Sequence, residues 1–192
     1  ADRPRALRPA LLGALAVLLA VLVPAPPSGA AEDLVRRLAG GDRYETAAAV
    51  ALDTHDAVDT VVLARSEPVP DGQEPDFADA VAGSTLAGAL DAAVLLTAGD
   101  QVPQPTMDAI SQLAPDEVRL LGGEAAIGAS VAETLTEAGY TVERHSGASR
   151  IETAAAIAAA ADTGADTAIV ATGYAFPDAL AAGSLAYGAG YP

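Results

Sequence analysis

The chain lacks cysteine, tryptophan and lysine, and only 4% of its 192 residues are aromatic. Without cysteine it can form no disulfide framework, no thiolate metal site and no cysteine nucleophile. Its 10 basic residues, all arginine, stand against 26 acidic residues, so the formal net charge is −16. This charge argues against a nucleic-acid partner, because binding to phosphates requires a basic face. Hydrophobic residues make up 51% of the chain, too many for a disordered acidic protein.

The N-terminal segment has the organisation of a secretory signal peptide. Three arginines precede an uncharged apolar stretch at 10–23, which is shorter than the roughly 20 residues of a membrane-spanning helix. Prolines and small residues follow, and we predict cleavage after Ala30 or Ala31. A signal peptide at 1–31 leaves no stable membrane span in the exported protein; a buried core helix and a membrane anchor are the alternatives. Cleavage would leave 7 arginines against 25 acidic residues, a net charge of −18.

Short apolar runs alternate with alanine-rich segments along the rest of the chain. We predict strands at 60–64, 92–97, 118–122 and 167–172, and a weaker one at 140–143. We predict helices at 42–52, 79–90, 105–113, 127–138 and 149–161. Uninterrupted apolar runs are typical of strands that are buried on both faces. The alternation therefore predicts an α/β fold with a mainly parallel sheet flanked by helices.

An internal repeat is the strongest pattern in the sequence. Residues 37–51 and 144–158 are identical at nine of fifteen positions, at an offset of 107. Further on, residues 77–82 match 176–181 at an offset of 99, which places eight extra residues in an acidic, proline-rich surface loop of the first copy. We predict a first repeat unit at 32–143 and a truncated second unit at 144–192, and we expect the chain to be part of a longer protein.

Both copies of the repeat begin with a helix-start motif. The pattern Asp/Ser-x-x-Glu is a capping box, in which the first side chain accepts from a free helix N–H and the glutamate reaches back to the cap's own N–H. An aspartate also lies at the start of the helix that follows the first strand of each copy, where a ligand contact is the alternative to a cap. We assign structural capping roles to Asp42, Glu45, Ser149, Glu152, Asp79 and Asp178.

Arginines and glycines provide the candidate ligand-binding residues. Arg43 and Arg150 occupy the first helical position, where the helix dipole disfavours a cation. We expect an intramolecular ion pair at each; contact with an anion or a sugar is the alternative. Arg65, Gly122 and Gly123 follow predicted strands, at the sheet edge where α/β proteins bind ligands, and free N–H groups of the glycine pair before a helix suit an anion.

Catalytic and metal-binding patterns are scarce, and we predict no catalytic residue, metal or cofactor. No GxSxG motif is present, and His55 and His145 do not correspond under the repeat. We expect both histidines in solvated loops. Acidic residues at 66–76, together with Asp79, suit Ca²⁺ chemically, but the EF-hand spacing is missing, so a solvated loop is favoured.

Four ordered motifs carry a resemblance to a known family: GGDRYETAAAVA, the FxDA helix start, LLGGEAAIG and GASRIETAAAIA. Across residues 34–192 the sequence resembles the bacterial cell-wall-binding repeat type 2 family. The resemblance implies a toprim-like fold and a non-catalytic module that holds secreted proteins on Gram-positive cell walls through anionic wall polymers. It also implies neighbouring repeats as partners, usually three copies packed in a triangle. The alanine and arginine usage is typical of a high-GC actinobacterium.

The charge of the chain conflicts with an anionic ligand, because like charges repel. Binding would then need local arginine clusters, a bridging cation or contacts with neutral sugars. Two other functions stay open. The chain can be the N-terminal part of a secreted cell-wall hydrolase, an amidase or protease, whose catalytic domain lies outside it. It can also be a self-association module.

Overall fold

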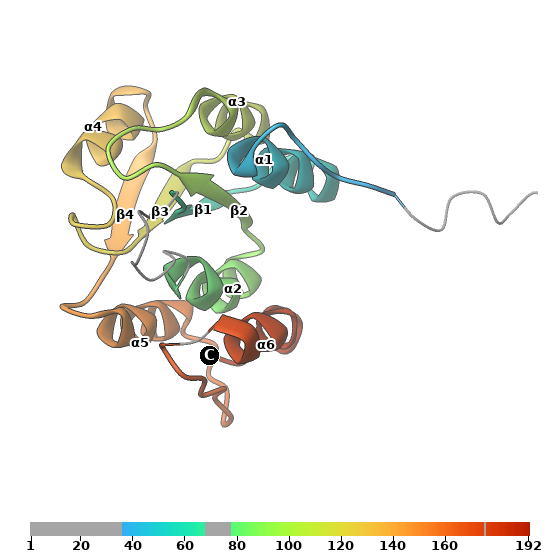
Figure 1. Cartoon of the computed structure of the whole chain (residues 1–192), viewed down its shortest axis with the longest axis vertical. Coiled ribbons are helices and arrows are strands. Elements are labelled where there is room, and N and C mark those ends of the chain that lie inside the picture. Colours follow the sequence, from blue (N-terminus) through green and yellow to red (C-terminus); the bar gives the residue numbers. More distant parts are fainter. Residues whose placement is uncertain (1–35, 68–77, 175) are drawn as a thin grey trace, which may run out of the picture. The chain divides into compact units, whose positions relative to one another are not determined.

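The computed structural model describes residues 36–67, 78–174 and 176–192. Within the compact unit Leu38–Pro192, four parallel strands form one sheet in the order β2-β1-β3-β4 (Figure 1). The strands are β1 (Thr60–Arg65), β2 (Ala93–Thr97), β3 (Glu117–Leu121) and β4 (Thr141–His145). The predicted α/β fold with a parallel sheet is confirmed, and each of these strands lies within two residues of its predicted bounds.

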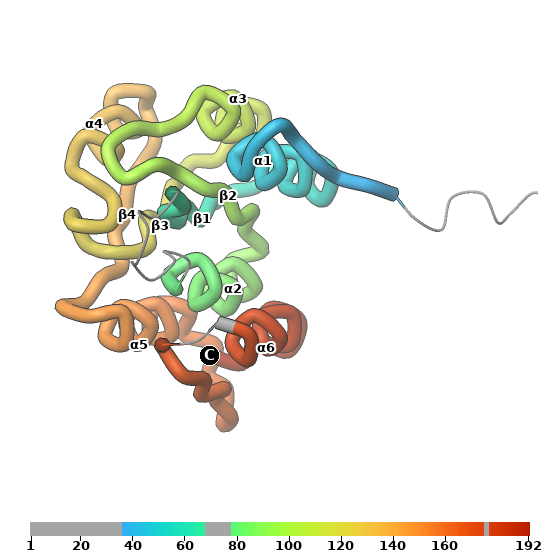
Figure 2. The backbone as a smooth tube through the Cα atoms, in the orientation of Figure 1, coloured from blue at the N-terminus to red at the C-terminus, as the bar shows by residue number. Residues whose placement is uncertain are grey.

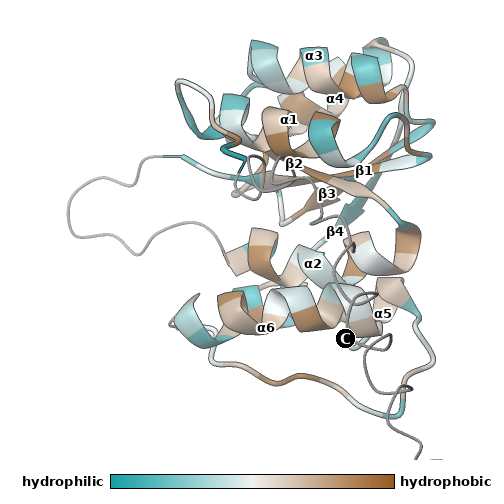
Figure 3. Ribbon diagram, turned by 90° about the vertical axis from the view of Figure 1, so that its right-hand side faces the viewer, coloured by the Kyte–Doolittle hydropathy of each residue, from teal (hydrophilic) through white to brown (hydrophobic). Residues whose placement is uncertain are grey.

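Helices cover both faces of the sheet. They are α1 (Arg43–Thr54), α2 (Ala78–Leu90), α3 (Gln104–Leu113), α4 (Ala129–Glu137), α5 (Arg150–Ala161) and α6 (Phe176–Ala189). On one face lie α1, α3 and α4; on the other lie α2 and α5, with α6 packed against α2 (Figure 3). No helix among the described residues is long and apolar enough to span a membrane.

Strand β1 supplies both hydrophobic cores, which explains its uninterrupted apolar run. Side chains alternate across a strand. Val61 and Leu63 therefore pack beneath α1, α3 and α4, while Val62 and Ala64 face α2 and α5. All four side chains are fully buried.

The second repeat contributes to the core of the first. Helix α5 lies beside α2 on the sheet, as the path of the chain in Figure 2 shows. Its Ile157 is fully buried in a cluster with Val62, Leu86 and Leu121. The two repeats thus share the hydrophobic core that lies between the sheet and helices α2 and α5.

The predicted strand at 167–172 does not form. This stretch is irregular, and Val170 is 94% exposed. Its counterpart β1 lies between β2 and β3, and the 192 residues contain no second copies of those two strands. An apolar run becomes a strand only when neighbouring strands satisfy its backbone N–H and C=O groups. The predicted signal peptide at 1–31 and the acidic residues at 68–76 lie outside the described part of the chain.

Candidate functional site

Both copies of the helix-start motif are capped by a side chain. Asp42 Oδ1 accepts from the Glu45 N–H at 2.8 Å, and Ser149 Oγ accepts from the Glu152 N–H at 3.3 Å. The second half of the predicted capping box differs, since Glu45 accepts from the N–H of Gly41, one residue before the cap. Local hydrogen bonding therefore accounts for the acidic and polar positions of this motif.

A glycine and a threonine complete the same motif, and the sequence analysis did not assign them a role. The N–H of Gly40 donates to Thr46 Oγ1 and that of Gly147 donates to Thr153 Oγ1, both at 3.0 Å. A Cβ atom on either glycine would collide with the backbone and Cβ of the motif glutamate. The glycine and the threonine are identical in the two copies of the repeat, and this identity could have pointed to their structural role.

The two repeat-equivalent arginines reach the same place in their units. Arg43 Nη1 donates to Ser66 Oγ at 3.4 Å, and Arg150 Nη1 donates to the carbonyl of Gly173 at 3.0 Å. Ser66 and Gly173 are themselves equivalent at the offset of 107. Both arginines are exposed, and the Arg150 guanidinium lies 6.0 Å from the ring centroid of Tyr174. The expected ion pairs are not formed among the described residues, where neither arginine meets a carboxylate.

The strand order makes the carboxyl ends of β1 and β3 the candidate ligand-binding edge. Ligands of open α/β sheets bind where the strand order reverses, and the order 2-1-3 reverses at this pair. Ala64 of β1 lies opposite Leu121 of β3, so the two strands end at the same level. Arg65 ends β1, and Gly122 directly follows β3. The structure thus brings the predicted residues Arg65 and Gly122 to one edge.

At this edge Arg65 is held by a carboxylate of its own loop. Its Nε and Nη2 atoms donate to Glu67 Oε2 at 3.0 and 2.7 Å, and the N–H of Gly99 donates to Glu67 Oε1 at 2.8 Å. The Gly99 N–H, followed by the Arg65 guanidinium, holds the pKa of Glu67 below its usual value. Tyr44 fixes the loop by donating its hydroxyl to the Ser66 carbonyl at 2.6 Å.

The glycine pair does not lie at a helix start, and the N–H of Gly122 is not free as we expected. The N–H of Gly122 donates to the His145 carbonyl at 2.9 Å, and α4 begins only at Ala129. Gly122 has a φ of +110°, and a Cβ there would lie 2.7 Å from Asp79 Oδ2, in the first turn of α2. The Gly123 carbonyl accepts from two later N–H groups of its own turn. The pair shapes the loop rather than opening it.

His145 does not lie in a solvated loop, whereas His55 directly follows α1. His145 is the last residue of β4 and only 7% exposed, and its Nε2 lies 3.3 Å from Arg119 Nη1 and 3.7 Å from Glu143 Oε1. Burial lowers its pKa. His55 is half-buried and caps the end of α1. The prediction failed for His145 because charged residues on an edge strand hide the apolar alternation of β4.

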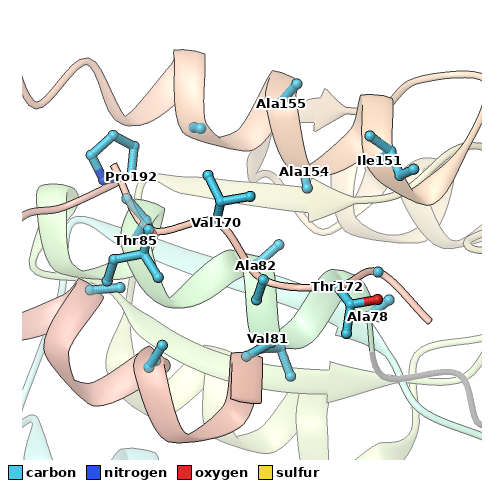
Figure 4. A pocket seen from close by; sticks show the side chains of 18 of the residues that line it. Ala78, Val81, Ala82, Thr85, Ile151, Ala154, Ala155, Val170, Thr172 and Pro192 are labelled. Atoms are coloured by element: carbon cyan, nitrogen blue, oxygen red, sulfur yellow. The ribbon is translucent and has the colours of Figure 1, made fainter. Parts of the chain in front are cut away.

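A mainly apolar cavity of about 460 Å³ lies between α2, α5, α6 and residues 168–174 (Figure 4). Val81, Ile151 and Val170 line it together with many alanines, and Arg150 is the charged residue in its lining. It offers no acid–base pair. Among the described residues, no three His, Cys, Asp or Glu side chains come together as a metal site.

Comparison with known proteins identifies the family. The model for cell wall binding domain 2 (CWB2) matches residues 37–132 and 144–192. The chain belongs to this family. CWB2 is a cell wall binding domain, so the chain is a cell-wall-binding module, as the resemblance implied. Each part of the internal repeat falls within one of the two matched stretches.

The matched relatives are an amidase and an amidase enhancer. The chain is 26% identical over 166 residues to N-acetylmuramoyl-L-alanine amidase LytC of Bacillus subtilis, covering 86% of this chain and 32% of that protein. It is 35% identical over 156 residues to the amidase enhancer of the same organism, covering 81% and 21%.

Two solved structures have the same fold. Cwp6 and Cwp8 from Clostridium difficile each superpose with a TM-score of 0.72 over 81% of this chain, at 29% and 26% identity. The chain spans about a quarter of each of these structures and between a fifth and a third of the curated relatives. These organisms are Bacillus and Clostridium, so the comparisons do not support an actinobacterial origin.

Proposed function

We propose that this chain is the non-catalytic part of a secreted protein and that it binds anionic cell-wall polymers. One observation carries the choice of an anionic ligand. Arg43 and Arg150 occupy equivalent exposed positions, and in a strongly acidic chain neither is neutralised by a described carboxylate. A guanidinium at a helix start is locally unfavourable, and a bound anion offsets that cost.

The overall negative charge limits this binding to short range. Exposed charges are screened beyond about 8 Å at physiological salt, so a local arginine can hold an anion although the whole protein is acidic. The repulsion of the remaining surface slows the encounter with the wall. Polymer binding should therefore strengthen with moderate salt before it weakens at high salt.

The paired replacement of Arg43→Ala and Arg150→Ala tests the proposal. We expect the doubly substituted chain to melt like the parent, because each guanidinium makes an exposed hydrogen bond of small net value, ~0–1 kcal/mol. We also expect it to sediment less with purified cell walls. Arg36→Ala with Arg37→Ala removes the same charge from exposed positions and is the matched control. If both double variants sediment equally with the walls, Arg43 and Arg150 are not part of the binding site.

The similarity to an amidase over 86% of this chain favours a second candidate, a part of a cell-wall hydrolase. We propose that any hydrolytic activity of the longer protein resides outside these residues. The chain alone should then release no soluble fragments from purified walls.

Secretion of the protein is tested separately by N-terminal sequencing of the exported form. We expect Ala31 or Glu32 as its first residue. An intact N-terminus on membrane-bound protein would contradict the signal peptide.

A further inference from the structure

Three hydrogen-bond donors converge at the carboxyl ends of β1 and β2 in the first repeat. They are Nε and Nη2 of Arg65 and the backbone N–H of Gly99, and they contact the two oxygens of one carboxylate, that of Glu67. A guanidinium edge combined with a loop N–H is the donor set that binds phosphate or carboxylate anions. These three donors therefore form an oxyanion site, and the anion that they bind is the Glu67 carboxylate of the same chain.

The backbone leaves room for this anion at Gly99. A Cβ atom there would lie 3.2 Å from Arg65 Nε and 3.3 Å from Glu67 Oε2, in the space that the carboxylate and guanidinium share. Any side chain at this position would crowd the bound oxygen atoms. The glycine thus serves the anion as well as the turn.

Bonds that do not involve Glu67 hold the Gly99 loop and the backbone of Ser66 in place. The Gly99 carbonyl accepts from the N–H of Gly128 at 2.6 Å, and the Asp100 carbonyl accepts from Ser130 Oγ at 2.8 Å. On the other side, Tyr44 holds the Ser66 carbonyl. Removal of the Glu67 charge therefore leaves the loops and their donors positioned for another anion.

The second repeat lacks this internal anion. At the offset of 107, the counterparts of Arg65 and Glu67 are Thr172 and Tyr174. Where the first repeat places a carboxylate, the second places an aromatic ring, with Arg150 above it. In the first repeat a carboxylate of the chain neutralises the arginine at this position, whereas the second repeat has no charged residue at either counterpart.

We propose that Glu67 is an internal ligand that occupies the oxyanion site of the first repeat and competes with anionic groups of the wall polymer. The inference rests on the proposed binding of anionic polymers. Binding at the Arg65–Gly99 site requires displacement of Glu67, whereas Arg43 and Arg150 are accessible without it. Glu67 is a specificity-determining residue in this scheme, since only a polymer dense in oxyanions displaces it.

The test is a titration with inorganic phosphate, followed at the amide of Gly99 and the Nε–H of Arg65 by NMR. Glu67→Gln keeps the size of the side chain and removes its charge. A site that is filled for 90–99% of the time binds a competitor about 10–100-fold more weakly than an open one. We expect Glu67→Gln to bind phosphate at Gly99 at least about tenfold more tightly than the parent chain, in line with this occupancy.

Controls separate charge, folding and function. Glu124→Gln removes one exposed carboxylate from the neighbouring β3–α4 loop and should leave phosphate binding at Gly99 unchanged. Glu67→Asp keeps the negative charge but has a shorter side chain, so it should also leave the Gly99 N–H open to phosphate. This variant replaces Glu67→Gln in the test if Glu67→Gln does not fold. Equal phosphate affinity in the parent and in a folded Glu67 variant would overturn the inference.

Sedimentation with walls distinguishes this inference from the proposed function. If no variant pellets with walls but Glu67→Gln gains phosphate binding at Gly99, the inference stands and the polymer proposal fails. If the parent pellets with walls and Glu67→Gln gains nothing at Gly99, the polymer proposal stands and the internal ligand is wrong.

Discussion

Replacement of Ile157 by alanine tests whether α5 of the second repeat completes the core of the first. The Ile157 side chain is fully buried in the cluster that contains Val62, Leu86 and Leu121. Truncation of a buried isoleucine to alanine costs about 2–5 kcal/mol through lost burial and the remaining cavity. For a protein of this size, 1 kcal/mol shifts the melting temperature by roughly 2–4 °C. A cost of about 3 kcal/mol thus predicts a fall of about 6–12 °C.

The repeat supplies a matched control at Val50, the counterpart of Ile157 in α1. Val50 is 43% exposed, so Val50→Ala should cost less than about 1 kcal/mol. Both substitutions replace a β-branched residue by alanine inside a helix, so the gain in helix propensity is similar in the two and cancels in the comparison.

The assay is thermal unfolding of both variants and the parent, followed by circular dichroism. We expect a single transition that moves down markedly for Ile157→Ala and little for Val50→Ala. The reasoning is refuted if the two variants melt alike. It is also refuted if Ile157→Ala shifts only a minor separate transition, because α5 would then unfold independently of the sheet.

Two further predictions concern the helix-start motif and the buried histidine. Gly40→Ala and Gly147→Ala should each lower the free energy of unfolding by about 1–3 kcal/mol in urea titrations, because the new Cβ collides with the motif glutamate; Gly188→Ala, which meets no atom within 4 Å, should be neutral or stabilising. The lowered pKa of His145 means that the folded state favours the neutral ring. The unfolded chain therefore binds more protons below about pH 6.5, and stability should fall as the pH drops through that range. His145→Gln should abolish this dependence and His55→Gln should not; the opposite pattern in pH-dependent melts would contradict the assignment.

Strands β1, β2 and β3 were predictable because their partners are also strands of the first repeat. Burial on both faces makes the apolar run of β1 continuous, and the runs of β2 and β3 are apolar enough to follow the same pattern although Arg119 interrupts β3. Residues 167–172 have the same pattern but no neighbouring strand, so the same rule failed there. Local pattern predicts the tendency to form a strand, whereas pairing with other parts of the chain decides whether it forms.

The candidate site was predictable only where its contacts are local. Asp42 and Ser149 contact residues three positions away, so the spacing alone identifies the caps. Glu67 was missed, because its partner Gly99 lies 32 residues away, in the loop after β2. The expected ion pairs of Arg43 and Arg150 failed for a related reason. Composition makes carboxylates abundant, but it does not place one within reach of a given guanidinium.

Comparison of the two copies separates the features that both units share from the features that only one unit has. The helix cap, the glycine contact and the threonine hydrogen bond recur in both copies, so they belong to the construction of the unit. The pair Arg65–Glu67 occurs in the first copy alone, and its counterparts Thr172 and Tyr174 carry no charge. This difference next to a shared helix start changes affinity for an anion without changing the helix start. The two repeats should therefore bind one polymer unequally, because Arg43 and Arg150 are both accessible from the start, whereas the Arg65–Gly99 site of the first repeat binds only when the polymer's anions outcompete Glu67.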